Sequence, residues 1–158
     1  MEYIAVFLRG EAEAATYSDD LLHLPRWGEH EWRSLFARTG EQQARASEIV
    51  IQLGADDRTL YFVVSGALEV GSSYVDGMSM SPLAKIVAGS VVGEQSFFDG
   101  MPRSASVWAV NDCTLLKLPF REFEAFAREY PVPAQELAFA LGRVLSVRLR
   151  NTTMRIRR

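Results

Sequence analysis

The sequence predicts one domain that is mainly β, a jelly roll with flanking helices and a long helix at its C-terminal end. A length of 158 residues, 48% of them hydrophobic, suits a single core. Between residues 47 and 118, short segments rich in valine, isoleucine, leucine and tyrosine follow one another, separated by turns that contain glycine, aspartate or asparagine. Short strands at such close intervals favour a jelly roll. After Pro119 the apolar residues recur with the period of a helix.

The individual elements are predicted in chain order. A short amphipathic helix is expected at Glu29–Gln43, where Trp32, Leu35 and Phe36 recur at helical spacing between charged residues. The expected strands are Glu48–Leu53, Thr59–Val64, Ala67–Val70, Leu83–Val87, Ser104–Val110 and Thr114–Leu118. Helices are expected at Arg121–Tyr130 and then, past Pro131 and Pro133, along the rest of the chain.

The chain is expected to divide into an N-terminal helical or extended segment, residues 1–45, and a β-roll with C-terminal helices, residues 46–158, in one domain overall. The stretch Met1–Gly10 has the acidic Glu2 where a signal peptide has basic residues. No segment approaches the roughly 18 to 20 apolar residues of a transmembrane helix, so none is expected. The lone Cys113 cannot form an intrachain disulfide, and a cytoplasmic location is therefore expected.

The last helix carries a narrow apolar stripe and a basic end. The stripe has spacings of four, four, three and four residues and consists of Leu141, Leu145, Leu149, Thr152 and Ile156. From Arg143 to Arg158 there are six arginines and no acidic residue. The stripe either packs on its own barrel or pairs with a second copy of the chain. We favour a homodimer through this helix, because an arginine-rich helix end is poorly suited to burial within one domain.

Common enzyme sites are excluded by the residue inventory. Both histidines, His23 and His30, precede the predicted barrel, so the barrel strands offer no histidine ligands for a catalytic metal. There is no C-x-x-C pair, G-x-S-x-G elbow or phosphate-binding P-loop. We therefore expect no catalytic residues, no metal site and no cofactor, and the two histidines are interpreted as surface residues.

The stretch from residue 89 to residue 106 combines the groups that a cyclic nucleotide requires. Gly93 allows close approach of the backbone, and the carboxylate of Glu94 can accept a hydrogen bond from a ribose hydroxyl. Arg103 offers a planar fork to two oxygens of a cyclic phosphate. The small residues Ser104 and Ala105 let backbone N–H groups approach the same anion, and the serine hydroxyl adds a donor. The alternative is an ion pair between Glu94 and Arg103 across an empty loop.

This stretch resembles the phosphate-binding cassette of the cyclic-nucleotide-binding domain family, which includes catabolite activator proteins, protein kinase A regulatory subunits and nucleotide-gated channels. The resemblance extends from Ser47 to the C-terminus and implies a β-roll of that family's type. It implies that Glu94 binds the ribose, that Arg103 binds the phosphate with Ser104 and Ala105 beside it, and that Gly93 is the close-approach position. The positions that match the family's order and spacing are Gly54, Leu60–Val63, Ser65-Gly66, Gly89, Gly93-Glu94 and Pro102–Ala105.

The cassette departs from the family pattern at three places. Ala46-Ser47 replaces a glycine, Val92 replaces a common phenylalanine, and Gln95 stands where leucine or isoleucine is usual. The first two are packing changes. Gln95 is a polar residue in the cassette, and it either alters the pocket or faces solvent.

A second resemblance lies in the last helix. The run from Arg148 to Thr153 is similar to the catabolite activator segment in which adjacent hydroxyl residues reach the adenine, one from each subunit of a dimer. It implies that Thr152 and Thr153 bind the base. The alternative is that both are ordinary threonines on the helix surface.

The expected function is therefore reversible binding of a cyclic mononucleotide, cAMP in preference to cGMP, which changes the C-terminal helices so that an unidentified protein effector responds. A helix-turn-helix module does not fit after the last helix, so no sequence-specific DNA binding by this chain alone is expected. The arginine-rich end is open to nucleic acid, an anionic membrane surface, an acidic partner or solvent. The alternative function is a protein-interaction or assembly module whose pocket is vestigial or binds another ligand, such as a cyclic dinucleotide.

Overall fold

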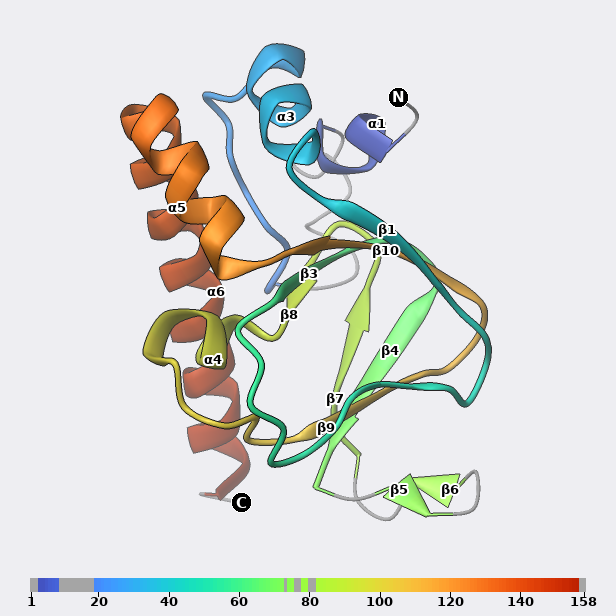
Figure 1. Cartoon of the computed structure of the whole chain (residues 1–158). Helices are drawn as coiled ribbons and strands as arrows, with labels where there is room; N and C mark the ends of the chain where they lie inside the picture. Colours follow the sequence, from blue (N-terminus) through green and yellow to red (C-terminus); the bar gives the residue numbers. More distant parts are fainter. Residues whose placement is uncertain (1–2, 9–18, 73, 76–77, 80–81, 157–158) are drawn as a thin grey trace.

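The fold consists of two four-stranded antiparallel sheets, as the sequence predicts for a jelly roll (Figure 1). The computed structural model describes residues 3–8, 19–72, 74–75, 78–79 and 82–156. The first sheet has the order β1 (Gly40–Ala44), β10 (Cys113–Leu118), β3 (Leu60–Ser65) and β8 (Val91–Val92). The second has the order β2 (Ile49–Ile51), β9 (Ser106–Ala109), β4 (Ala67–Gly71) and β7 (Pro82–Val87), and a hairpin of β5 (Tyr74–Val75) and β6 (Met78–Ser79) is separate.

The helices lie at one end and along one side of the two sheets (Figure 1). Helices α1 (Tyr3–Leu8) and α3 (Glu29–Phe36) are at the end where β1 begins, and α4 (Glu94–Asp99) follows β8. Helices α5 (Phe120–Glu129) and α6 (Pro131–Ile156) pack on each other, and α6 runs along the whole side of the barrel past α4. No helix within the described residues is both long and apolar enough to cross a membrane.

The predicted helix Glu29–Gln43 is wrong in its second half. It ends at Phe36, and residues Gly40–Ala44 form β1, which pairs with β10 along its full length. The sequence of β1 lacks alternation of apolar and polar residues because it is an edge strand and only Ala44 is buried. The other predicted strands and the two C-terminal helices are confirmed, with bounds that shift by a few residues.

The predicted stripe on α6 is not one packing seam. Leu141 is buried against the domain, whereas Leu149 and Ile156 are 68% and 80% exposed. Two separate faces of α6 explain this difference. The face that packs on the domain consists of Ala134, Leu137, Ala140, Leu141 and Val144. A second face, exposed along its length, has alternating spacings of four and three residues and consists of Gln135, Phe139, Gly142, Ser146, Leu149, Thr153 and Ile156.

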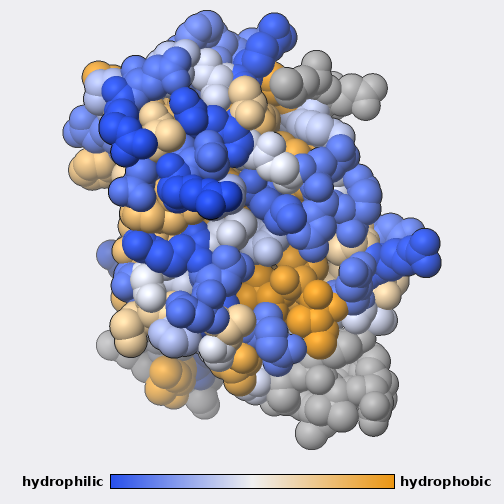
Figure 2. All heavy atoms as spheres, in the orientation of Figure 1, coloured by the Kyte–Doolittle hydropathy of each residue, from blue (hydrophilic) through white to orange (hydrophobic). Residues whose placement is uncertain are grey.

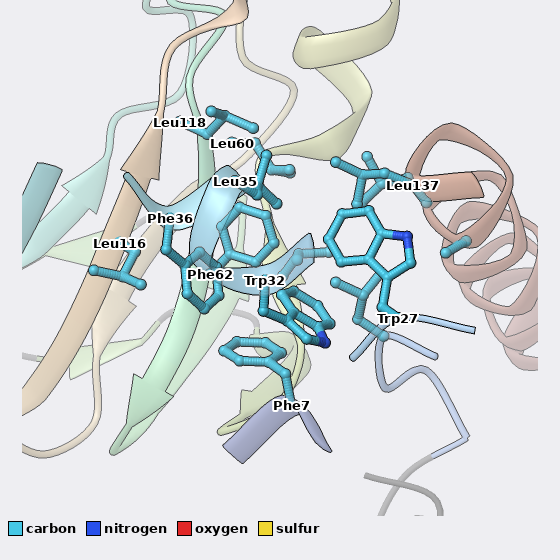
Figure 3. Close-up of a cluster of buried hydrophobic side chains, with 14 of the residues drawn as sticks. Phe7, Trp27, Trp32, Leu35, Phe36, Leu60, Phe62, Leu116, Leu118 and Leu137 are labelled. Carbon is cyan, nitrogen blue, oxygen red and sulfur yellow. The ribbon is translucent and has the colours of Figure 1, made fainter. Parts of the chain in front are cut away.

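An aromatic core joins the N-terminal helices to the barrel and to α6 (Figure 3). The ring of Trp32 lies 5.0 Å from that of Phe7 and 4.8 Å from that of Trp27. Phe36 in turn lies 5.4 Å from Phe62 of β3, measured between ring centroids. Residues that precede the barrel therefore share one core with it, which fixes the segment after residue 19 beside α6.

Candidate functional site

A cavity of about 410 Å³ lies between the barrel and α6. Its walls come from β4 and β7, from the turn between β8 and α4, from residues 103–107, from the last turns of α6 and from Asp19 and Asp20. The structure brings six of the seven residues predicted from the sequence to this cavity: Gly93, Glu94, Arg103, Ser104, Ala105 and Thr152.

Gly93 occupies a position that only glycine fits. Its φ of 87° lies in the left-handed region, where side chains are strained. A Cβ atom there would be 2.7 Å from Nη1 of Arg103 and 2.9 Å from the carbonyl oxygen of Thr59. The turn at Gly93 also starts α4 and places Glu94 in the first turn of that helix. Glu94 is buried there, with 6% of its surface exposed.

Arg103 is buried, with 4% of its surface exposed, and its two terminal nitrogens are held by the protein. Nη1 donates to the carbonyl oxygen of Gly93 at 2.9 Å, and Nη2 donates to the carbonyl oxygen of Thr59 at 2.6 Å and to the carboxylate of Asp57 at 3.0 Å. The Nε–H group of Arg103 is buried, and no atom of the described residues accepts a hydrogen bond from it. A buried donor without an acceptor is costly, so an anion that reached Nε would satisfy it.

Asp57 is a partner of Arg103 that the sequence analysis missed. Burial alone would raise the pKa of its carboxyl, but hydrogen bonds from Thr59 and Arg103 outweigh burial and lower the pKa below its ordinary value of 3.8. The only sequence signal is an acidic pair, Asp56-Asp57, just before a strand.

The contribution of Asp57 to stability is expected to depend on pH. A carboxyl whose pKa is lowered on folding stabilises the fold above its unfolded pKa, and this stabilisation disappears as the pH falls through the folded pKa. We expect Asp57→Asn to lower the free energy of unfolding by a constant amount above about pH 5, and the difference from wild type to shrink below the ordinary value of 3.8. Urea unfolding of both proteins between neutral and acid pH measures this, and a difference that grew in acid would contradict the assignment.

Glu94 and Arg148 form an ion pair between α4 and α6. Oε1 of Glu94 lies 2.8 Å from Nη1 of Arg148. Burial alone would lower the pKa of the Arg148 guanidinium, but the charges of Glu94 and Asp20 raise the pKa above its ordinary value. Among the described residues no ion pair joins Glu94 to Arg103, because each has another partner. The alternative of a closed pair between them is therefore wrong.

The remaining predicted residues differ in their position relative to the cavity. The hydroxyl of Ser104 donates to Oε1 of Gln95 at 2.6 Å, and both residues line the cavity. Gln95 therefore borders the cavity and is also exposed to solvent. The hydroxyl of Thr152 donates to the carbonyl oxygen of Arg148 at 3.0 Å. Thr153 lies outside the cavity, on the exposed face of α6, and its hydroxyl donates to the carbonyl oxygen of Leu149.

Several residues that line the cavity were not among the site residues predicted from the sequence. They are Asp19 and Asp20 ahead of the barrel, Lys85 on β7, and Asn151 and Arg155 on α6. Arg148 and Asn151 belong to the run that resembles the catabolite activator segment, but that resemblance assigns a role only to the two threonines. Within the part of the chain that the structure describes, no group of histidine, cysteine and acidic residues is arranged to hold a metal ion.

Comparison with known proteins identifies what this arrangement is similar to. The profile of the family described as "Cyclic nucleotide-binding domain" matches residues 41–130. The cAMP-activated global transcriptional regulator of Haemophilus influenzae is 30% identical over 112 residues, which is 70% of this chain and 48% of that protein. The chain thus spans about half the length of that relative.

Solved structures agree in fold. A cyclic nucleotide-binding domain from Methylobacillus flagellatus has a TM-score of 0.79 and 21% identity, with 98% of this chain and 80% of that chain covered. The catabolite activator protein of Thermus thermophilus has a TM-score of 0.70 and 26% identity, with 87% of this chain and 62% of that chain covered.

Proposed function

Because the chain belongs to the cyclic nucleotide-binding domain family, we propose that it is a sensor that binds a cyclic mononucleotide, with cAMP as the preferred ligand, and that it catalyses no reaction. The observation that carries the proposal is the pair of buried side chains, Glu94 and Arg103, on one cavity. A buried carboxylate and a buried guanidinium with different partners are the two groups needed for a ribose and a cyclic phosphate.

In this proposal the phosphate lies at Arg103 and the ribose at Glu94. The unpartnered Nε–H of Arg103 donates to a phosphate oxygen, and the backbone N–H groups of Ser104 and Ala105 add donors. A ribose hydroxyl donates to the carboxylate of Glu94, which keeps its ion pair with Arg148. Gly93 leaves room for this arrangement because any side chain there would displace Arg103.

The base lies in this proposal at the last turns of α6, where Asn151 and Thr152 line the cavity. The threonine hydroxyl can donate or accept, and it can therefore serve the exocyclic amine of adenine or the carbonyl of guanine. The choice of cAMP rests on the Haemophilus relative, which is described as cAMP-activated. We place the protein in the cytoplasm, where its buried free thiol, Cys113, stays reduced.

Helix α6 is the element that passes the signal to a protein effector. Its exposed face includes Leu149, Thr153 and Ile156, and Figure 2 shows hydrophobic side chains at the surface in the lower left, where Figure 1 places the last turns of α6. We propose that two copies of the chain pair through this face, since its alternating spacing is that of a coiled coil. Thr153 would then lie at the seam, where it can reach the nucleotide of the partner subunit.

Leu149→Glu is expected to abolish this pairing, because it places like charges opposite each other in an apolar seam. Sedimentation or light scattering should report a dimer for wild type and a monomer for the variant. Leu53→Glu, at a side chain that is 44% exposed and does not belong to α6, is the control and should stay dimeric. A monomeric wild-type protein, or a dimeric Leu149→Glu variant, would exclude α6 as the dimer interface.

Calorimetric titration with cAMP, cGMP and cyclic di-GMP tests the proposed ligand. Saturable binding of cAMP, tighter than that of cGMP, is expected, and a ligand at 100 times its Kd should stabilise the fold by about 2.7 kcal/mol. If only cyclic di-GMP binds, the ligand is a cyclic dinucleotide and the proposed cyclic mononucleotide is wrong. No binding of any of the three would favour an assembly module with a vestigial pocket.

Gly93→Ala is expected to weaken cAMP binding at least tenfold, because the new Cβ must displace Arg103 or the Thr59 carbonyl. Gly54→Ala is the matched control, since Gly54 has a similar φ of 83° and a Cβ there comes within 4 Å of no atom in the part of the chain that the structure describes. Both variants should lose roughly 1 to 3 kcal/mol of stability from backbone strain. Only Gly93→Ala should lose affinity, and equal affinity in the two variants would disprove the role given to the close contact.

A further inference from the structure

Residues 19–22 run between α6 and the barrel (Figure 1). Asp19 and Asp20 of this segment form one wall of the cavity. It is fixed to the barrel by the backbone, since N–H of Leu22 donates to the carbonyl oxygen of Gly89 at 3.1 Å and the hydroxyl of Ser90 donates to the carbonyl oxygen of Asp20 at 2.9 Å. Leu21 and Leu22 are buried. This segment is therefore packed into the fold at the site itself.

The same segment is tied to α6 by charged groups. Arg143 donates to the carbonyl oxygens of Asp19 and Leu21 at 3.2 and 3.4 Å. One helical turn and a half further on, Nε of Arg148 donates to the carboxylate of Asp20 at 2.8 Å. Asp20 is only 8% exposed, so this ion pair is largely removed from water. Removing one partner of such a pair leaves the other as an uncompensated buried charge.

Arg148 is shared between this segment and the proposed ribose ligand. Its Nε is held by Asp20, its Nη1 by Glu94, and its Nη2 by the Ser90 hydroxyl at 3.1 Å and the Val91 carbonyl at 2.7 Å. All three nitrogens of one planar group are thus fixed by different elements. Loss of the Asp20 carboxylate removes the group that holds Nε, and because the bonds of this network support one another, it also weakens the hold on Glu94.

We propose that residues 19–22 form a clasp that holds α6 on the barrel, and that Asp20 is a positioning residue of the nucleotide site, acting through Arg148 on Glu94. This inference rests on the proposed function and extends it to a segment outside the cassette. Because coupling between two sites is reciprocal, nucleotide bound at Glu94 must also stabilise the clasp. Ligand occupancy is then communicated to the N-terminal segment as well as to α6.

Asp20→Asn tests the clasp by two measurements. Calorimetry should show cAMP affinity lowered by about 2- to 30-fold, the range found for residues that couple to a site without touching the ligand. Hydrogen exchange of the ligand-free proteins should show faster exchange in the variant over residues 145–152, and cAMP should slow exchange at Leu22 in wild type. Glu124→Gln, which removes a charge from an exposed position on α5, is the control and should match wild type in both affinity and exchange rates.

Two further variants separate positioning from a general loss of structure. Asp20→Glu keeps the carboxylate and should restore most of the affinity. In a Glu94→Gln background, where Arg148 has lost the partner that Asp20 positions, Asp20→Asn should have little additional effect. Additive losses, or wild-type affinity in Asp20→Asn, would overturn the inference while leaving the proposed function intact. If wild type binds no cyclic nucleotide, the proposed function fails, and the exchange rates over residues 145–152 alone decide whether the clasp exists.

Discussion

Replacing Arg103 by alanine is expected to weaken cAMP binding by about 2 to 5 kcal/mol, roughly 30- to 5,000-fold, because it leaves the phosphate charge buried and unpaired. The loss has a second source. Arg103 also holds the carbonyl oxygens of Gly93 and Thr59, which shape the turn that carries Glu94. Calorimetric titration of wild type and variant measures the change, with the thermal unfolding of each recorded to establish that the variant is folded.

Two companion variants make the Arg103 result specific. Arg103→Lys keeps the charge but cannot make the same set of planar hydrogen bonds, and it should recover only part of the affinity. Arg121→Ala removes an exposed arginine from α5 and should bind like wild type. If Arg103→Ala is folded and binds cAMP with wild-type affinity, Arg103 is not the phosphate ligand.

Replacing Phe62 by alanine is expected to lower the free energy of unfolding by about 3 to 5 kcal/mol, the usual cost of removing a buried aromatic ring. Phe62 is fully buried on β3, and its ring lies 5.8 Å from that of Phe7 and 5.4 Å from that of Phe36. The void left by the missing ring would therefore lie where the N-terminal helices meet the barrel. Since small domains are stable by only about 5 to 15 kcal/mol, this is a large part of the total.

Urea unfolding measures the Phe62 effect. Val110→Ala, at a side chain that is 40% exposed, is the control and should change stability by about 0.5 kcal/mol or less. A loss below about 1 kcal/mol in Phe62→Ala would mean that the N-terminal helices do not share a core with the sheets.

The sequence was sufficient to predict the jelly roll and most of the cassette, because both depend on local patterns. The strands have compact apolar runs, and the chemistry at Gly93, Glu94 and Arg103 lies within eleven consecutive residues. The cavity brings these three residues together, whereas their roles toward a ligand remain predictions.

The parts that sequence reasoning missed depend on contacts distant in the chain. The partners of Glu94 and Arg103 are Arg148 and Asp57, which lie far from them in sequence. Arg148 begins the run that resembles the catabolite activator segment, but that resemblance indicates contacts with the base and no pairing with Glu94. Asp20 was invisible for the same reason, since its partner on α6 is 128 residues away. Helix α4 was not among the predicted elements because six residues are too few to establish a helical period.

The structure of the protein with bound cAMP tests the central claim most directly. We expect a phosphate oxygen within hydrogen-bond distance of Nε of Arg103, a ribose hydroxyl on the carboxylate of Glu94, and the base against Thr152. A nucleotide bound elsewhere on the molecule, or one that lies in this cavity with neither Glu94 nor Arg103 in contact with it, would contradict the assignment.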